Sequence, residues 1–100
     1  MYSVGSVTLD DSTKTVMADN EEVTLTPKEF EILKMLMQSP GRVFSPKEIY
    51  EKIWEESMMP GCEKTVAVHI RHIREKIEIN PNEPRFLKVI WGQGYKIEGQ

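Results

Sequence analysis

The sequence predicts an α+β domain in which a short antiparallel sheet precedes three helices and a C-terminal β-hairpin. Three patterns support this prediction: alternating apolar and polar runs near the N-terminus, two nearly identical helix-start signals, and two apolar runs separated by a glycine-rich turn. A chain of 100 residues is long enough for one domain with one modest core. We therefore expect a single domain over residues 1–100, divided into a sheet (1–25), three helices (26–78) and a hairpin (85–99).

The N-terminal strands are predicted from runs in which apolar and polar residues alternate. These runs are 4–9, 15–17 and 23–25. Between them lie Asp10-Asp11-Ser12 and Asp19-Asn20, which are residue types that favour turns. The pattern indicates an antiparallel meander of three strands, or of four if Gly5-Ser6 interrupts the first run.

The first two helices begin with the same capping signal. Thr26-Pro27-Lys28-Glu29 and Ser45-Pro46-Lys47-Glu48 each place a hydroxyl at the N-cap, proline at the first helical position and glutamate at the third. The helices should run over 27–38 and 46–54, with residues 42–44 extended between them. The side chains expected in the core are Phe30, Leu33, Leu36 and Met37 of the first helix and Ile49, Tyr50 and Ile53 of the second.

A third helix, predicted over 63–78, has one apolar and one polar face. At 100° per residue, its β-branched side chains form a narrow stripe of Val66, Ile70, Ile73 and Ile77. The opposite face holds Lys64, Thr65, Val68, Arg71, His72 and Glu75, and the stripe is flanked by His69 and Arg74. This face suits a DNA major groove, because arginine can bind guanine through two hydrogen bonds and a small apolar side chain can contact the thymine methyl group. Together with the preceding helix and a hairpin of strands 86–90 and 95–98, it predicts a winged helix-turn-helix.

The charge distribution is compatible with a nucleic-acid partner, although the whole chain is acidic. The net charge is −3, but residues 1–62 hold six Lys or Arg against eleven Asp or Glu, whereas residues 63–100 hold seven against five. Residues 64–76 alone have a net charge of +3. DNA binding requires a local positive patch that displaces counterions from phosphates, and the third helix supplies one.

Two segments of the chain match a known pair of motifs at a specific separation. Residues 65–74 are Thr-Val-Ala-Val-His-Ile-Arg-His-Ile-Arg, and residues 89–95 are Val-Ile-Trp-Gly-Gln-Gly-Tyr. They closely resemble the OmpR/PhoB-type DNA-binding domain of bacterial two-component response regulators, whose pattern is T-V-x-V-H-I-x-x-L-R followed by a strand and R-G-x-G-Y. The Leu-Thr-Pro-x-Glu-Phe segment at 25–30 and Trp54 at the end of the second helix also match. The resemblance covers essentially the whole chain.

The resemblance implies which residues contact double-stranded DNA. The third helix would enter the major groove, and the hairpin would be a wing that reaches an adjacent minor groove. The phosphate-binding positions fall on Trp54, Lys64, Thr65, His69, Arg71, Arg74 and Tyr95. The base-reading positions fall on Ala67, Val68 and His72. The wing tip comprises Trp91, Gly92, Gln93 and Gly94.

The resemblance also implies partners other than DNA. The loop that would contact RNA polymerase comprises Glu55, Glu56, Ser57, Met58 and Met59. A receiver domain, phosphorylated on aspartate, would precede this segment in the full protein. Pairing of receivers would raise the effective concentration of a second copy of this domain at a tandem half-site.

Three residues depart from the family pattern. Trp91 stands where the family has arginine on the wing, His72 stands where a basic residue is common, and Glu75 adds a negative charge to the polar face. A carboxylate there can accept a hydrogen bond from cytosine N4 but otherwise repels phosphate. We therefore expect one copy to bind DNA with modest affinity and specificity to depend on the pairing of two copies.

Other classes of function are weaker. Cys62, His69 and His72 could hold a metal ion, but a zinc site needs about four ligands and no fourth has suitable spacing. No nucleophile, base and orienting group occur together, and the glycines at 92 and 94 suit a hairpin tip better than a phosphate-binding loop. We expect neither an enzyme nor a cofactor site. Without a run of ~20 apolar residues or a signal peptide, we expect a protein of the bacterial cytoplasm.

The remaining alternative is a winged helix used only for protein–protein contact. Apolar Trp91 on the wing, apolar Met58-Met59 in the loop and the acidic first half of the chain favour it. Titration of labelled duplex DNA at two salt concentrations distinguishes the two interpretations, because phosphate contacts make affinity depend on salt.

Overall fold

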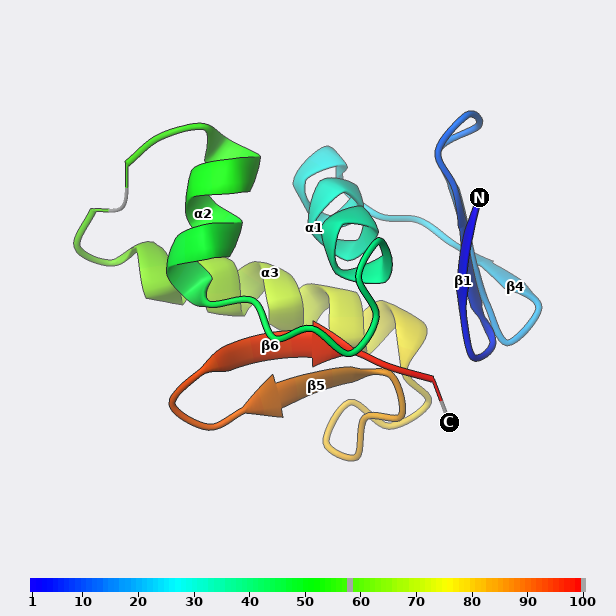
Figure 1. Cartoon of the computed structure of the whole chain (residues 1–100). Helices are drawn as coiled ribbons and strands as arrows, with labels where there is room; N and C mark the ends of the chain where they lie inside the picture. Colours follow the sequence, from blue (N-terminus) through cyan, green and yellow to red (C-terminus); the bar gives the residue numbers. More distant parts are fainter. Residues whose placement is uncertain (58, 100) are drawn as a thin grey trace.

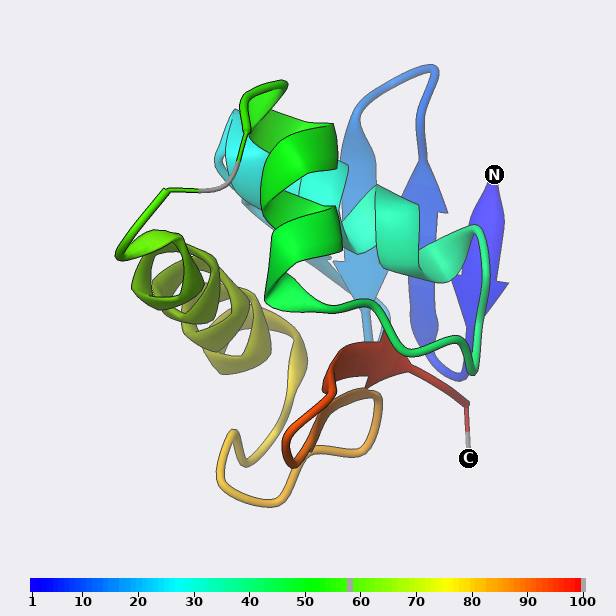
Figure 2. The same cartoon turned by 60° about the vertical axis from the view of Figure 1, so that its left-hand side comes forward.

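The computed structural model describes residues 1–57 and 59–99 of the chain. The strands of the N-terminal sheet are β1 (Tyr2–Val4), β2 (Val7–Asp10), β3 (Thr15–Ala18) and β4 (Glu21–Val23). The helices and the hairpin strands are α1 (Pro27–Met37), α2 (Pro46–Trp54), α3 (Cys62–Ile77), β5 (Leu87–Ile90) and β6 (Gly94–Ile97). The sheet lies to one side of α1, and the hairpin lies beneath the helices in both views (Figures 1 and 2). The predicted order of sheet, three helices and hairpin is confirmed.

The N-terminal sheet has four antiparallel strands in sequence order, so the four-strand alternative is the correct one. The chain turns between β1 and β2 at Gly5, which has a φ of 58°. A Cβ atom at this position would overlap the ring of Phe86. Glycine is therefore required both for the left-handed turn and for the close approach of the segment before β5.

Both predicted capping boxes are present. At the start of α1, the Thr26 hydroxyl accepts a hydrogen bond from the backbone N–H of Glu29 at 3.3 Å, and the Glu29 carboxylate accepts one from the backbone N–H of Thr26 at 3.0 Å. Ser45 and Glu48 make the same reciprocal pair at the start of α2. These bonds satisfy backbone donors that have no partner inside the helix. Helix α1 ends at Met37, one residue earlier than predicted.

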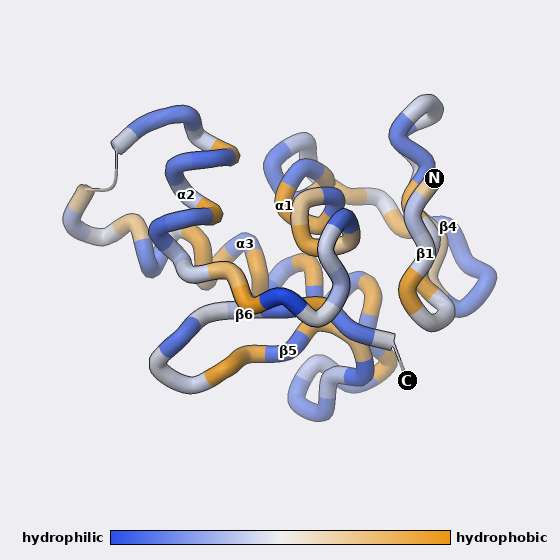
Figure 3. The backbone as a smooth tube through the Cα atoms, in the orientation of Figure 1, coloured by the Kyte–Doolittle hydropathy of each residue, from blue (hydrophilic) through white to orange (hydrophobic). Residues whose placement is uncertain are grey.

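The apolar stripe of α3 faces the core, as the helical projection predicts. Val66, Ile70, Ile73 and Ile77 are each at most 2% exposed, and α3 packs against α1 and α2. Figure 3 shows apolar and polar segments alternating along each helix, as expected for helices with one buried face. In the other helices Ile49 and Tyr50 are buried, whereas Ile53 is only partly buried and packs at the edge of the core.

The hairpin is joined to the extended segment between α1 and α2. Phe44 and Tyr95 exchange two backbone hydrogen bonds of 2.8 and 2.9 Å, so Phe44 is extended as predicted, whereas residues 42 and 43 have no regular structure. Gly94 has a φ of 148°, and a Cβ atom there would overlap the backbone carbonyl of Phe44. This close approach requires glycine at the start of β6 and fixes the hairpin to the helical core.

The end of α3 is joined to β5 through a buried acid. Glu78 is 6% exposed, and its carboxylate accepts hydrogen bonds from the backbone N–H groups of Arg85, Phe86 and Leu87 at 2.7–2.9 Å. A carboxylate that accepts several N–H bonds can be buried at acceptable cost. The chain therefore enters the hairpin at a defined position relative to α3. No helix in the described part of the chain is long and apolar enough to cross a bilayer.

Candidate nucleic-acid interface

The polar face of α3 is open to solvent. Lys64, Ala67, Val68 and Arg71 are exposed, and Thr65, His69, His72 and Arg74 are partly exposed. Within residues 1–57 and 59–99, Lys64 and Arg71 make no ion pair and no side-chain hydrogen bond. Two cations without partners in the described part of the chain therefore lie on the same helix face as Val68, whose exposed fraction is 43%.

Trp54 and His69 lie in an aromatic cluster at the start of this face. The ring of Trp54 stacks on Tyr50 with centroids 5.1 Å apart, and the His69 ring meets Trp54 edge-on at 5.1 Å. Nδ1 of His69 lies 2.8 Å from the carbonyl oxygen of Thr65. Because a carbonyl can only accept, Nδ1 bears a proton, and Nε2 can donate to a phosphate only when the ring is charged.

Arg74 and Tyr95 are less available for phosphate binding than the resemblance implies. Nη2 of Arg74 donates a hydrogen bond of 2.7 Å to the carbonyl of Pro81, in the loop after α3. Tyr95 is partly buried, and this burial raises the pKa of its phenol although the nearby positive charge of Arg74 lowers it. One nitrogen of the Arg74 guanidinium is thus already hydrogen-bonded within the protein.

His72 faces the first turn of α1. Its Nδ1 lies 3.5 Å from Oε2 of Glu29, whose side chain is 3% exposed, while the His72 side chain is 42% exposed. Oε1 of Glu29 accepts a 2.6 Å hydrogen bond from Nζ of Lys76, one turn further along α3. Sequence analysis predicts only a capping role for Glu29, because its contacts with α3 join residues more than 40 positions apart and leave no local signal.

The Glu29 carboxylate is ionised despite being buried. Burial alone would raise its pKa, but the hydrogen bonds from Lys76 and from the backbone of Thr26 lower the pKa more, so that it lies below its ordinary value. A buried negative charge therefore lies next to His72 and Lys76, at the edge of the polar face of α3.

The wing tip is apolar and exposed. Trp91 is 94% exposed and Val89 47%, and Gly92 adopts a left-handed φ of 73° in the turn. Residues 89–95 contain no charged side chain. Further back on the hairpin, Lys88 and Lys96 both pair with Glu98, at 3.5 and 3.1 Å. Figure 1 shows the wing tip and the start of α3 at the same side of the molecule, which Figure 2 turns forward.

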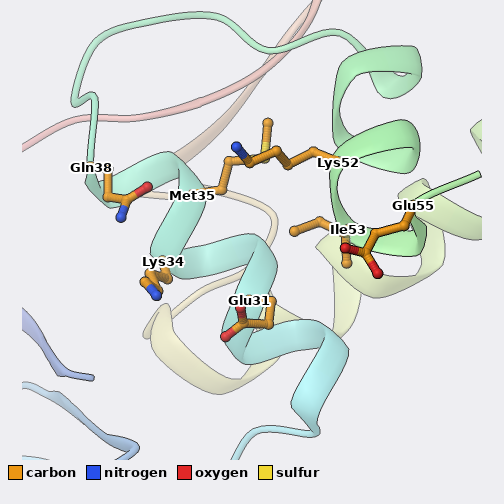
Figure 4. Close-up of a pocket in the computed structure, with 7 residues that line it drawn as sticks. All are labelled: Glu31, Lys34, Met35, Gln38, Lys52, Ile53 and Glu55. Carbon is orange, nitrogen blue, oxygen red and sulfur yellow. The ribbon is translucent and has the colours of Figure 1, made fainter. Parts of the chain in front are cut away.

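The loop between α2 and α3 is exposed and acidic. Glu55, Glu56, Ser57 and Met59 are exposed, whereas Met58, also predicted to contact polymerase, lies outside the described residues. Glu55 ends α2 in a left-handed conformation with a φ of 54°. Its side chain also borders a pocket between α1 and α2, to which no residue of α3 or the wing contributes (Figure 4). The other lining residues are Glu31, Lys34, Met35, Gln38, Lys52 and Ile53.

A helix with an exposed basic face, held on two other helices and followed by a hairpin, defines a winged helix-turn-helix domain. The chain belongs to the family described as "Transcriptional regulatory protein, C terminal", whose model matches residues 20–97. This is a family of transcriptional regulators rather than of enzymes.

Curated relatives include two bacterial regulators. The chain is 48% identical over 82 residues to the alkaline phosphatase synthesis transcriptional regulatory protein SphR of Synechococcus elongatus, covering 82% of this chain and 32% of SphR. It is 39% identical over 80 residues to the regulatory protein VanR of Enterococcus faecium, covering 80% of this chain and 35% of VanR. The chain thus spans about a third of the length of these relatives.

Solved structures have the same fold. The response regulator DrrB of Thermotoga maritima, an OmpR/PhoB homolog, matches with a TM-score of 0.87 at 36% identity, over 98% of this chain and 44% of DrrB. The DNA-binding domain of RstA from Klebsiella pneumoniae was solved in complex with the RstA box. It matches with a TM-score of 0.84 at 27% identity, over 96% of this chain and 94% of the RstA domain. The resemblance to the OmpR/PhoB type is confirmed.

Proposed function

We propose that this chain binds double-stranded DNA in a sequence-specific manner and regulates transcription, with α3 in the major groove. In this proposal it is the output domain of a phosphorylation-controlled response regulator. The observation that supports it most directly is the exposed face of α3, where Lys64 and Arg71 have no partner among the described residues and lie beside Val68. The family supports the same function, as does the likeness to RstA in complex with its DNA box.

Individual side chains take the roles that the motifs suggest. Lys64, Thr65, His69, Arg71, Arg74, Tyr95 and Trp54 contact phosphates or the sugar-phosphate backbone, while Ala67, Val68 and His72 face base edges. Lys64 and Arg71, which have no partner within residues 1–57 and 59–99, supply the strongest phosphate contacts, because Arg74 already donates to Pro81. The wing tip of Trp91, Gly92, Gln93 and Gly94 reaches the neighbouring groove through apolar contact.

The whole protein adds further partners to this domain. Residues 1–100 form one domain, a phosphorylated receiver precedes it, and two copies bind tandem half-sites. The loop at 55–59 contacts RNA polymerase, and its exposed acidic side chains, Glu55 and Glu56, suit a basic partner surface. A function on bacterial DNA places the protein in the cytoplasm.

Selection of bound duplexes from a random pool tests this function. We expect one enriched half-site sequence, and a second copy of it at a fixed spacing in the tightest duplexes. Titration of that duplex at several salt concentrations should give a log–log slope of roughly −4 to −5, as expected for four to six phosphate contacts. If no duplex is enriched at any salt concentration, the exposed Trp91 would instead indicate a protein–protein module.

A further inference from the structure

The carboxylate of Glu29 belongs to α1 but is enclosed by side chains of α3. Oε1 accepts hydrogen bonds from the backbone N–H of Thr26 at 3.0 Å and from Nζ of Lys76 at 2.6 Å. Oε2 lies 3.5 Å from Nδ1 of His72. Since Oε1 has two donors, the charge on Oε2 is directed at the imidazole.

An imidazole at neutral charge has one N–H donor and one acceptor nitrogen, and its surroundings decide which nitrogen is which. A carboxylate oxygen beside Nδ1 stabilises the tautomer that has the proton on Nδ1. The Glu29 side chain is only 3% exposed, so water screens its charge less than it would screen a carboxylate at the surface. In serine hydrolases a carboxylate hydrogen-bonded to Nδ1 holds a histidine in this tautomer, and here the carboxylate acts on Nδ1 through its charge at 3.5 Å. The ring then has its lone pair on Nε2.

We propose that Glu29 determines which bases His72 selects, by holding its imidazole in the tautomer whose Nε2 accepts a hydrogen bond. In the major groove, an acceptor pairs with the amino groups of cytosine N4 and adenine N6. It does not pair with guanine O6 and N7 or with thymine O4, because these atoms are acceptors too. This inference rests on the proposed function, since it requires His72 to face base edges.

The other charged groups around His72 do not reverse this preference. On α3, Lys76 is one turn away and bonds to Glu29 rather than to the imidazole. Glu75 and His69 are three residues away on either side, and Nδ1 of His69 is paired with the Thr65 carbonyl. Glu29 is the charged residue that α1 directs at the ring. Its buried oxygen is therefore the dominant influence on Nδ1.

The tautomer can be measured directly in the unliganded protein. The chain contains two histidines, His69 and His72, and their ring nitrogens can be distinguished by ¹⁵N NMR at pH 8 in protein labelled at histidine. A His69→Gln variant assigns the signals. We expect the His72 proton on Nδ1, and a shift toward Nε2–H in Glu29→Gln. A wild-type His72 that is mainly protonated on Nε2 would overturn the proposal, even if Glu29→Gln does not fold.

Duplex selection tests the consequence for base preference. We expect wild-type protein to enrich cytosine or adenine at one position of the half-site, and Glu29→Gln to lose roughly three- to tenfold of that preference, the worth of one hydrogen bond. Glu31→Gln is the matched control: it removes an exposed negative charge from α1, the helix that carries Glu29, and should leave that base preference unchanged. His72→Ala should lose the preference as Glu29→Gln does.

The outcomes separate this inference from the proposed function. If no duplex is enriched by the wild-type protein, DNA binding itself is wrong. If a half-site is enriched but its base preferences are identical for wild type and a folded Glu29→Gln variant, DNA binding stands and the role of Glu29 is wrong.

Discussion

The carboxylate of Glu29 and the ammonium group of Lys76 lie 2.6 Å apart and join the first turn of α1 to the last turn of α3. The contact connects residues 47 positions apart in the chain. It pairs a buried charge, because the Glu29 side chain is only 3% exposed. The edge of the polar face of α3 is thus joined to α1 through this acid.

Replacing Lys76 should therefore destabilise the fold. Lys76→Ala leaves the Glu29 carboxylate buried with one partner fewer, so we expect a loss of about 1–3 kcal/mol in the free energy of unfolding, measured with urea. Lys64→Ala removes a side chain that is exposed and has no ion pair among the described residues, so it should change this free energy by less than about 0.5 kcal/mol. Equal effects of the two variants would contradict a structural role for the Glu29–Lys76 pair.

The free energy of unfolding should depend on pH because the Glu29 carboxylate becomes protonated in acid. Its folded-state pKa lies below its ordinary value, mainly because hydrogen bonds from Lys76 and Thr26 outweigh burial. The stabilisation is complete above the unfolded pKa of about 4.3 and is lost as the pH falls through the folded value. The stability difference between wild type and Glu29→Gln, measured by urea unfolding from pH 7 to pH 3, should therefore shrink on acidification. A constant difference would mean that Glu29 has no altered pKa.

Glu78 should control the attachment of the hairpin. Glu78→Ala removes an acceptor from three backbone N–H groups at 85–87, and we expect a loss of about 2–4 kcal/mol in the free energy of unfolding. Amide hydrogen exchange should become faster at residues 85–87 by a larger factor than at the amides of α1. Glu83→Ala, in the exposed loop nearby, serves as the control and should leave both measurements unchanged.

Arg71 and Arg74 should differ although both are predicted to bind phosphates. Arg71→Ala should weaken binding to specific and random duplexes alike, reduce the salt slope by about 1 and leave the melting temperature unchanged. Arg74→Ala should also lower the melting temperature, because Arg74 donates to the Pro81 carbonyl. Identical melting temperatures for the two variants would argue against a structural role for Arg74.

The wing can be tested by restoring the charge that the family has there. Trp91→Arg places a cation on an exposed tip whose neighbours at 89–95 are uncharged. If the tip lies near DNA, affinity should rise and the salt slope should become steeper by about 1. Trp91→Gln is the neutral control. Unchanged affinity and slope for Trp91→Arg would mean that the wing does not approach the duplex.

Much of this fold could be predicted from local pattern. The capping boxes at Thr26 and Ser45, the buried stripe of α3 and the glycine-tipped hairpin all involve residues within a few positions of one another. Hydrogen-bond geometry and helical periodicity act over that range, so the residue types alone indicate them. Even so, local pattern does not decide between three and four N-terminal strands, because the break at Gly5 depends on a contact with the distant Phe86.

The sequence by itself determined the type and order of the elements and the polar face of α3, because these follow from neighbours along the chain. Only the tertiary structure decided that His72 lies against Glu29, that Arg74 bonds to Pro81, and that Phe44 pairs with Tyr95. Such contacts join separate elements, and they depend on how the helices and hairpin pack around the core. Packing buries charged and polar groups away from water, where each is stable only with a hydrogen-bond or ion-pair partner. The local sequence does not specify which residue that partner is.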